Sequence, residues 1–203
     1  MVILGAGGHA KDLVSLLAKE SKGSITFFDD TGNFSPQNLF LVAYKMITDL
    51  KNLALAFQKD PSALIATGGI EQRRALYQKC IEAGGEVVNY FGPQALVSEY
   101  AVIHDSVMIM HQAFVSSETN IGKGTLVNRA AGIHHDSRIG EFCEVGPGAQ
   151  ILGRCTIGNG VSIGAGAIVL PDKAIGDHCV IGAGSVVAND LPNNSSVKGI
   201  PAK

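Results

Sequence analysis

The chain lacks the features of nucleic-acid-binding and membrane-spanning proteins. It has no Trp, aromatic residues make up 6% of its 203 residues, and the formal net charge is −2. Without a basic stripe or a charged tail, we expect neither nucleic acid nor an anionic lipid surface as a partner. The apolar stretch from Leu50 is far shorter than the ~20 residues of a membrane span, and the opening VIL resembles a strand and not a signal peptide. We therefore expect no membrane association and a cytoplasmic protein.

Cysteine is also scarce, with four residues and no Cys-x-x-Cys pair or Cys/His cluster typical of zinc sites. Three of the four, Cys143, Cys155 and Cys179, lie at equivalent places in the repeat described next. A free Cys commonly behaves as a small buried hydrophobe. We therefore predict structural cysteines and no metal.

What the chain has in abundance is Val and Ile at every sixth position. The residue four further on is small in most cases, and Gly follows the aliphatic residue in seven. This pattern indicates a hexapeptide β-helix. The sixteen aliphatic positions are Val97, Ile103, Ile109, Val115, Ile121, Val127, Ile133, Ile139, Val145, Ile151, Ile157, Ile163, Val169, Ile175, Ile181 and Val187.

In such a helix each hexad supplies one short strand and one corner, so three hexads make a coil. Sixteen hexads predict about five coils, stacked to a height of roughly 25 Å at the ~4.8 Å interstrand spacing. A single coil cannot bury its own apolar face, so the stack folds as a unit. The period leaves the handedness of the coils open.

The first thirty residues follow a different plan. A short buried strand leads into a glycine turn and a helix, and Gly5, Gly7 and Ala10 match the G-x-G-x-x-G/A turn of nucleotide-binding folds. The next strand ends in Asp29 and Asp30, at the distance where such a fold places an acid. Glycine amides at a helix N-terminus can hold a pyrophosphate. A tight turn without a ligand is the alternative reading.

About 93 residues precede the first hexad, which is room for one half of a dinucleotide fold. A later strand at 63–69 leads into a helix at 71–83, so Gly68 lies at a strand end where open α/β sheets bind ligands. A further helix is expected around 49–59. The predicted fold is an α/β half-Rossmann domain over residues 1–92 followed by an all-β parallel β-helix over 93–203.

This combination resembles the NeuD and PglD families of bacterial sugar acyltransferases. The resemblance is carried by GAGGHA at 5–10, FFDD at 27–30, ATGG at 66–69, NRAAGIHHDSRIGEF at 128–142 and the terminal KGIPAK. It implies left-handed coils, a homotrimer, acetyl-CoA as co-substrate in the crevice between adjacent β-helices, and a nucleotide sugar held by the N-terminal domain.

The resemblance also assigns roles to residues. His135 matches the general base and Asp136 its acidic partner. Where the family often has a second histidine against the acetyl donor, this chain has Glu144. The residues implied for the nucleotide sugar are Gly7, Gly8, His9, Asp29, Asp30, Gly68 and Asn128. Those implied for acetyl-CoA are Glu144, Gly146, Ala165 and Ala183.

His135 is also a candidate on its own chemistry. Histidine titrates near neutrality and can accept a proton from an attacking amine or hydroxyl. Adjacent strand residues point to opposite faces, so contact between His135 and Asp136 requires a turn or a neighbouring subunit. A polar, solvated corner is the alternative, and His104, followed by Asp105, is the second candidate for the base.

The sequence thus predicts an acetyl-CoA-dependent N-acetyltransferase acting on a nucleotide-linked amino sugar, with a 4-amino-4,6-dideoxy sugar as the favoured acceptor. The alternatives are O-acetylation of a sugar such as sialic acid, and a non-catalytic β-helix protein that binds a nucleotide.

Overall fold

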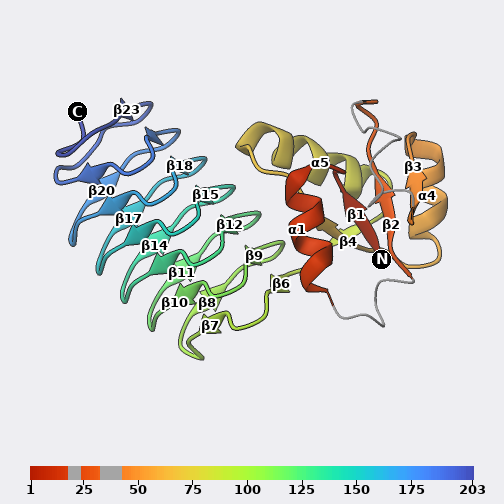
Figure 1. Ribbon diagram of the computed structural model, residues 1–203, viewed down its shortest axis with the longest axis horizontal. Coiled ribbons are helices and arrows are strands. Elements are labelled where there is room, and N and C mark those ends of the chain that lie inside the picture. Colours follow the sequence, from red (N-terminus) through yellow and green to blue (C-terminus); the bar gives the residue numbers. More distant parts are fainter. Residues whose placement is uncertain (18–23, 33–42) are drawn as a thin grey trace. The chain divides into compact units, whose positions relative to one another are not determined.

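The computed structural model describes residues 1–17, 24–32 and 43–203. These form two compact units, Met1–Val88 and Asn89–Lys203 (Figure 1).

The N-terminal unit is built on a five-stranded parallel sheet with the strand order β3-β2-β1-β4-β5. The chain starts in the middle, moves to one edge, and crosses back to the other side of β1, as in half of a Rossmann fold. The strands are β1 (Val2–Leu4), β2 (Thr26–Phe28), β3 (Lys45–Ile47), β4 (Ser62–Ile65) and β5 (Glu86–Val87). The described helices are α1 (Gly8–Leu16), α4 (Leu50–Phe57) and α5 (Ile70–Glu82).

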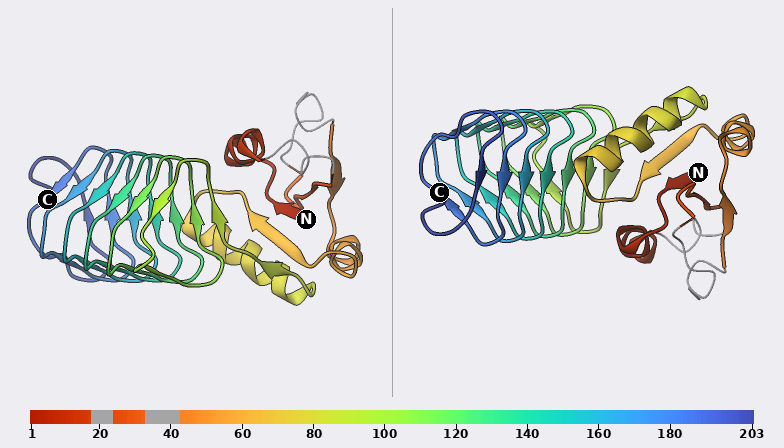
Figure 2. Two further views of the ribbon diagram at one scale, coloured as in Figure 1. Left: turned by 90° about the horizontal axis from the view of Figure 1, so that it is seen from below. Right: turned by 90° about the horizontal axis from the view of Figure 1, so that it is seen from above.

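The helices cover both faces of this sheet, with α1 on one face and α4 and α5 on the other (Figure 2). Because successive strand residues point to opposite faces, Val2 and Leu4 share a core with Leu53 and Phe57 of α4. Cys80 of α5 lies in the same core, where burial raises the pKa of its thiol to about 12. Two short strands, β3 and β5, were not expected from the sequence.

The second unit is a left-handed parallel β-helix, as predicted. Except at the C-terminal end, where the spacing is 16, each strand pairs in register with the strand 18 residues further on, as Phe114 with Gly132 and Gly132 with Gln150. Three parallel sheets result, one on each side of the coil.

For reference, the three sheets are named B, C and D. Sheet B contains β6 (Tyr90–Phe91), β9 (Met108–Ile109), β12 (Leu126–Val127), β15 (Glu144–Val145), β18 (Ser162–Ile163), β21 (Val180–Ile181) and β23 (Ser196–Val197). Sheet C contains β7 (Leu96–Val97), β10 (Phe114–Val115), β13 (Gly132–Ile133), β16 (Gln150–Ile151), β19 (Ile168–Val169) and β22 (Val186–Val187). Sheet D contains β8 (Val102–Ile103), β11 (Asn120–Ile121), β14 (Arg138–Ile139), β17 (Thr156–Ile157) and β20 (Ala174–Ile175).

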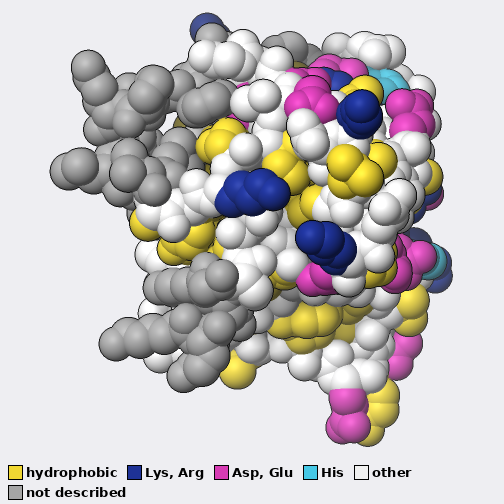
Figure 3. Space-filling view, turned by 90° about the vertical axis from the view of Figure 1, so that its right-hand side faces the viewer, with side chains coloured by type: hydrophobic (Ala, Val, Ile, Leu, Met, Phe, Trp, Pro, Cys, Tyr) yellow, Lys and Arg dark blue, Asp and Glu magenta, His cyan; other side chains and the backbone are white. Residues whose placement is uncertain are grey.

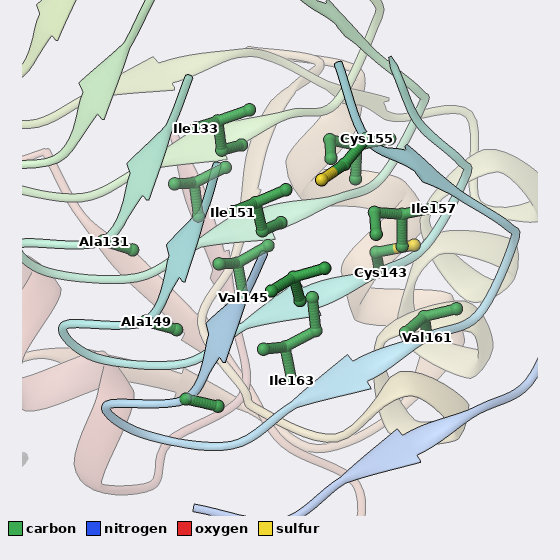
Figure 4. Packing of buried hydrophobic residues seen from close by; sticks show 14 of the residues in the cluster. Ala131, Ile133, Cys143, Val145, Ala149, Ile151, Cys155, Ile157, Val161 and Ile163 are labelled. Carbon is green, nitrogen blue, oxygen red and sulfur yellow. The ribbon is translucent and has the colours of Figure 1, made fainter. Parts of the chain in front are cut away.

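The interior of the coil holds the aliphatic positions of the hexads. Ile133 and Ile151 stack from adjacent coils, and Val145 and Ile163 do the same on the next side (Figure 4). All four are at most 1% exposed, so truncation of one to Ala would cost about 2–5 kcal/mol of stability. The alternation of large and small residues fills the narrow prism without aromatic rings.

The small positions of the hexads also bond one coil to the next. The Thr125 hydroxyl donates to the carbonyl of Gly140 at 2.8 Å, and the Cys143 thiol donates to that of Gly158 at 3.1 Å. Cys143, Cys155 and Cys179 are free and buried, and burial raises the pKa of Cys155. The predicted structural role of these cysteines is confirmed.

The glycines that directly follow the strands lie against the backbone of the next coil. A Cβ on Gly140, directly after its strand, would lie 2.5 Å from the carbonyl oxygen of Gly158 in the next coil. The residue in the left-handed region comes two positions later, where Phe142 has a φ of 50°. The glycine therefore allows close stacking of coils, and the turn itself tolerates other residues.

None of the helices formed by the described residues is long and apolar enough to cross a membrane. On the face shown in Figure 3, basic and acidic side chains lie interspersed among neutral and apolar ones.

Candidate active site

His135 lies in the corner between sheets C and D, in the turn between β13 and β14. Three backbone hydrogen bonds fix this corner to its neighbours. His134 N donates to Ile151 O at 2.9 Å, Asp136 N donates to Ser117 O at 3.1 Å, and the carbonyl of His135 accepts from Arg154 N at 2.9 Å. The backbone of this corner is thus held by the coils on both sides.

The turn brings the two predicted catalytic side chains together. Asp136 has a φ of 61°, a left-handed conformation that Asp adopts more readily than most residues. Its carboxylate oxygen Oδ2 lies 2.6 Å from Nδ1 of His135. The contact therefore forms within one chain, and no neighbouring subunit is required for it.

This contact determines which ring nitrogen can act as a base. A carboxylate only accepts hydrogen bonds, so Nδ1 must carry the proton and Nε2 of the neutral ring has a free lone pair. Both side chains are 52% exposed, so the imidazole is open to solvent. This arrangement suits proton transfer from a nucleophile.

Gly153 in the next coil lies beneath the imidazole. A Cβ built on Gly153 would be 2.7 Å from both Cε1 and Nε2 of His135, closer than any real contact. The ring can occupy its place only because residue 153 has no side chain.

An ion pair lies at the same corner, in the two coils that follow the coil of His135. Nε of Arg154 donates to Oδ1 of Asp172 at 2.6 Å, and a second guanidinium nitrogen donates to Oδ2 at 2.9 Å. The hydrogen bond from Arg154 is the main cause of the lowered pKa of Asp172. The corner therefore holds four charged or ionisable groups in three coils.

The other histidines are arranged differently. His134 makes an edge-on contact with the ring of Phe114, with centroids 5.9 Å apart, and its Nε2 lies 3.4 Å from Oε1 of Gln150. His104 and Asp105 are exposed, and in the described parts of the chain no hydrogen bond or ion pair joins their side chains. Of the two candidates for the base, only His135 has the acidic partner in place.

The residues expected to contact acetyl-CoA lie along a different corner, between sheets B and C. Glu144 is half-buried on β15, which precedes this corner. A Cβ on Gly146 would lie 2.9 Å from Ala165 N, and one on Gly164 would lie 2.5 Å from Ala183 N. Asn128 occupies the place of Gly146 one coil earlier, and its Oδ1 accepts from Arg129 N at 2.8 Å. These residues are brought to one edge of the prism, and His135 is on another.

In the N-terminal unit, a cavity of about 290 Å³ opens at the carboxyl ends of the strands. It lies where the strand order reverses, which is where open α/β sheets bind ligands. Of the residues expected to bind the nucleotide sugar, Gly7, Asp29 and Asp30 line it, and Gly8, His9 and Gly68 do not. The seventh, Asn128, belongs to the β-helix unit. Its lining is formed by Gly5, Ala6, Gly7, Asp29, Asp30, Thr31, Thr67, Gln72, Ala75, Leu76 and Lys79.

The two acids of this cavity have different surroundings. Asp29 accepts from Ala6 N at 3.2 Å and from the amide and hydroxyl of Thr31, so it ties the glycine turn to the end of β2. Asp30 instead pairs with Nζ of Lys79 at 2.6 Å. A Cβ on Gly7 or Gly8 would have no described atom within 4 Å, so there is open space above the turn.

Sequence reasoning missed Gly153, Arg154, Asp172 and Lys79. The first three could have been found from the coil length, because positions 18 and 36 residues after a corner residue stack on it. Lys79 lies on α5, and no repeat in the sequence indicates which face of this helix is turned toward Asp30.

Comparison with known protein families agrees with this architecture. Residues 1–80 match the PglD N-terminal domain, and residues 136–171 and 154–189 match the bacterial transferase hexapeptide (six repeats). A PglD N-terminal domain followed by transferase hexapeptide repeats is the combination expected from the resemblance to the NeuD and PglD families, so this resemblance and the predicted class, an acyltransferase, are confirmed. A search of curated protein sequences found no match.

Three solved structures are similar to this chain over its whole length. PerB from Caulobacter crescentus, in complex with CoA and GDP-perosamine, matches with a TM-score of 0.88 and 29% identity over 100% of this chain and 95% of that chain. The acetyltransferase domain of PglB from Neisseria gonorrhoeae, in complex with acetyl coenzyme A, matches with a TM-score of 0.86 and 29% identity over 100% and 97%. WeeI from Acinetobacter baumannii, at 24% identity and a TM-score of 0.72, shares the fold.

Proposed function

We propose that this protein transfers the acetyl group of acetyl-CoA to the amino group of a nucleotide-linked amino sugar, with a 4-amino-4,6-dideoxy sugar as the acceptor. The observation that carries the proposal is the 2.6 Å contact of Nδ1 of His135 with Asp136, which leaves Nε2 unprotonated on a half-exposed imidazole. The similarity to an N-acetyltransferase solved with CoA and GDP-perosamine supports the choice of substrates.

The reaction needs one base and no covalent intermediate on the enzyme. The neutral amine attacks the thioester carbonyl carbon, and Nε2 of His135 accepts the proton that the nitrogen loses as the C–N bond forms. The C–S bond then breaks, and the leaving CoA sulfur takes the proton from the imidazolium. Asp136 holds the ring in the required tautomer throughout and stabilises its charged form.

We also propose that the active enzyme is a homotrimer. In one chain, His135 and the acetyl-CoA residues Gly146, Ala165 and Ala183 lie on different edges of the prism, so a neighbouring β-helix is needed to bring one set to the other. The outer face of sheet C carries apolar side chains suited to such contact, with Leu96 66% and Phe114 42% exposed. Sedimentation equilibrium showing an active monomer would contradict both the trimer and a site shared between subunits.

The nucleotide is assigned to the cavity of the N-terminal unit. Gly7 and Gly8 at the start of α1 offer backbone N–H groups and open space for a pyrophosphate. Asp30 and Lys79 lie at the wall of the same cavity, where they can contact the remainder of the nucleotide.

The decisive experiment measures thiol release from acetyl-CoA with a panel of UDP-, GDP- and dTDP-linked amino sugars. Release with at least one amino sugar, and a product acetylated on nitrogen, is expected. Acetylation of a hydroxyl instead would favour the O-acetyltransferase alternative. Binding of nucleotide sugars without thiol release would favour a non-catalytic binding protein.

A further inference from the structure

The corner that contains His135 carries a column of charged residues. Asp136, Arg154 and Asp172 occupy the same place in consecutive coils, and all three have left-handed backbones, with φ values of 61°, 60° and 63°. Backbone hydrogen bonds hold the three turns together: Arg154 N donates to His135 O at 2.9 Å and Asp172 N donates to Gly153 O at 3.1 Å. Arg154 thus lies between one carboxylate in the preceding coil and one in the next.

Arg154 is paired with only one of these two carboxylates. Its Nε and a terminal nitrogen donate to both oxygens of Asp172, at 2.6 and 2.9 Å. This bidentate arrangement is the strongest geometry available to an arginine and a carboxylate. Asp136, on the other side, uses its Oδ2 for Nδ1 of His135 instead.

The pair of His135 with Asp136 and the pair of Arg154 with Asp172 interact electrostatically. Asp172 is the main cause of the raised pKa of Arg154, and Asp136 adds to it. His135 contributes to the lowered pKa of Asp172, behind Arg154 and together with Lys173. Glu118 occupies the same corner one coil before Asp136. Arg154 follows Asp136 by one coil in the same column, its backbone N–H is bonded to His135 O, and its charge interacts favourably with that of Asp136.

We propose that Asp172 is a positioning residue for catalysis, because it retains Arg154 and so leaves Asp136 free to pair with His135. The inference rests on the proposed role of His135 as the base. Asp172 itself does not touch the imidazole in this arrangement. Without Asp172, Asp136 is the carboxylate in the adjacent coil of the same column, and its pairing with Arg154 would withdraw it from Nδ1.

The consequence for chemistry lies in the tautomer of His135. With Asp136 in place, Nδ1 carries the proton and Nε2 is the base. Once Asp136 turns to Arg154, the ring loses the contact that selects this tautomer and fixes its orientation. Fewer enzyme molecules then present an unprotonated Nε2 to the substrate, although the base itself is still present.

The test is a double-mutant cycle with Asp172→Asn and Arg154→Gln, in the full-length protein. Asn is chosen because it tolerates a left-handed backbone. Asp172→Asn should lower kcat by roughly tenfold, less than the ~10²–10⁴-fold expected from loss of a general base. Arg154→Gln should leave kcat close to wild type, and the double variant should recover most of the activity lost in Asp172→Asn. Glu141→Ala, which removes an exposed carboxylate from another corner, is the matched control.

A readout independent of turnover is the nitrogen NMR spectrum of the His135 side chain at a pH where the ring is neutral. The wild type should show mainly the Nδ1–H tautomer, Asp172→Asn should shift toward Nε2–H, and the double variant should shift back. If the ion pair served only to stabilise the fold, Arg154→Gln would be as harmful as Asp172→Asn and the double variant no better, which would overturn the proposal.

The outcome also separates this inference from the proposed function. Should His135→Ala be inactive while Asp172→Asn keeps wild-type kcat and tautomer, the positioning role fails and the proposed base stands. Should His135→Ala retain full activity, the proposed base fails and the positioning role fails with it.

Discussion

The two units of the chain build their functional sites in opposite ways. In the N-terminal unit the cavity arises where irregular loops follow β1, β2 and β4, so its position is dictated by sheet topology. In the β-helix every coil repeats the same interior, and the candidate site arises where one corner departs from the repeat. The cavity of the N-terminal unit can therefore be located from the sheet topology. The candidate site of the β-helix can be located from residues that break the hexapeptide repeat, such as His135.

The largest expected effect comes from removing the base at the exceptional corner. His135→Ala should lower kcat by about 10²–10⁴-fold with little change in either KM, because the imidazole acts in the transition state more than in substrate binding. Steady-state kinetics with both substrates varied would measure this. If kcat stayed near wild type in a protein that binds both substrates, His104 would become the next candidate.

The same variant gives a pH test. Because a protonated imidazole cannot accept another proton, kcat/KM of the wild type should fall as the pH is lowered and His135 gains a proton. That acid limb should be absent from the residual activity of His135→Ala. An unchanged acid limb would assign it to another group.

A smaller loss of kcat is expected from a substitution at Gly153, in the coil next to His135. Gly153→Ala would place a methyl group against Cε1 and Nε2 of His135, so the ring must move and kcat should fall by roughly tenfold to a hundredfold, within the range available to general-base catalysis. In a His135→Ala background the same change should cost nothing further. An equal loss in both backgrounds would show that Gly153 acts on the fold instead of on His135, and thermal unfolding of each variant would confirm it.

A substitution in the cavity of the N-terminal unit should change the KM for the sugar nucleotide and not kcat. Asp29→Ala removes the carboxylate that ties the glycine turn to the end of β2, and the loss of such hydrogen bonds should raise KM for the sugar nucleotide by on the order of tenfold. KM for acetyl-CoA should be unchanged. Asp12→Ala, an exposed carboxylate on α1, is the control. Loss of acetyl-CoA affinity would show that the ligands had been assigned to the wrong units.

The smallest effect is expected at Glu144. Glu144→Gln keeps the shape and removes the charge, so it should change KM for acetyl-CoA by about twofold to fivefold, as for a partly exposed charge, and leave kcat nearly unchanged. A collapse of kcat with constant KM would instead make Glu144 part of the proton-transfer machinery.

The sequence predicted the β-helix well because its signal is repeated sixteen times, so each interior position is confirmed by others. It also predicted that His135 and Asp136 would act together, though only the structure shows that the left-handed backbone at Asp136 makes the contact. The strand β3 was missed because three residues, KMI, carry no alternation long enough to recognise. The ion pair of Asp30 with Lys79 could not be foreseen, since it joins residues 49 positions apart through the rotation of a helix.

The in-register pairing of strands 18 residues apart also limits how this domain can change its length during evolution. An insertion of 18 residues adds one complete coil and returns every later residue to its former side of the prism. An insertion of six or twelve residues would move the later residues to another side, and one that is not a multiple of six would turn interior residues outward. Only the last coil escapes this rule, since β23 pairs with β21 at a spacing of 16, as Val180 does with Ser196. Duplication of whole coils therefore lengthens the scaffold while leaving the corner at His135, and the chemistry proposed for it, untouched.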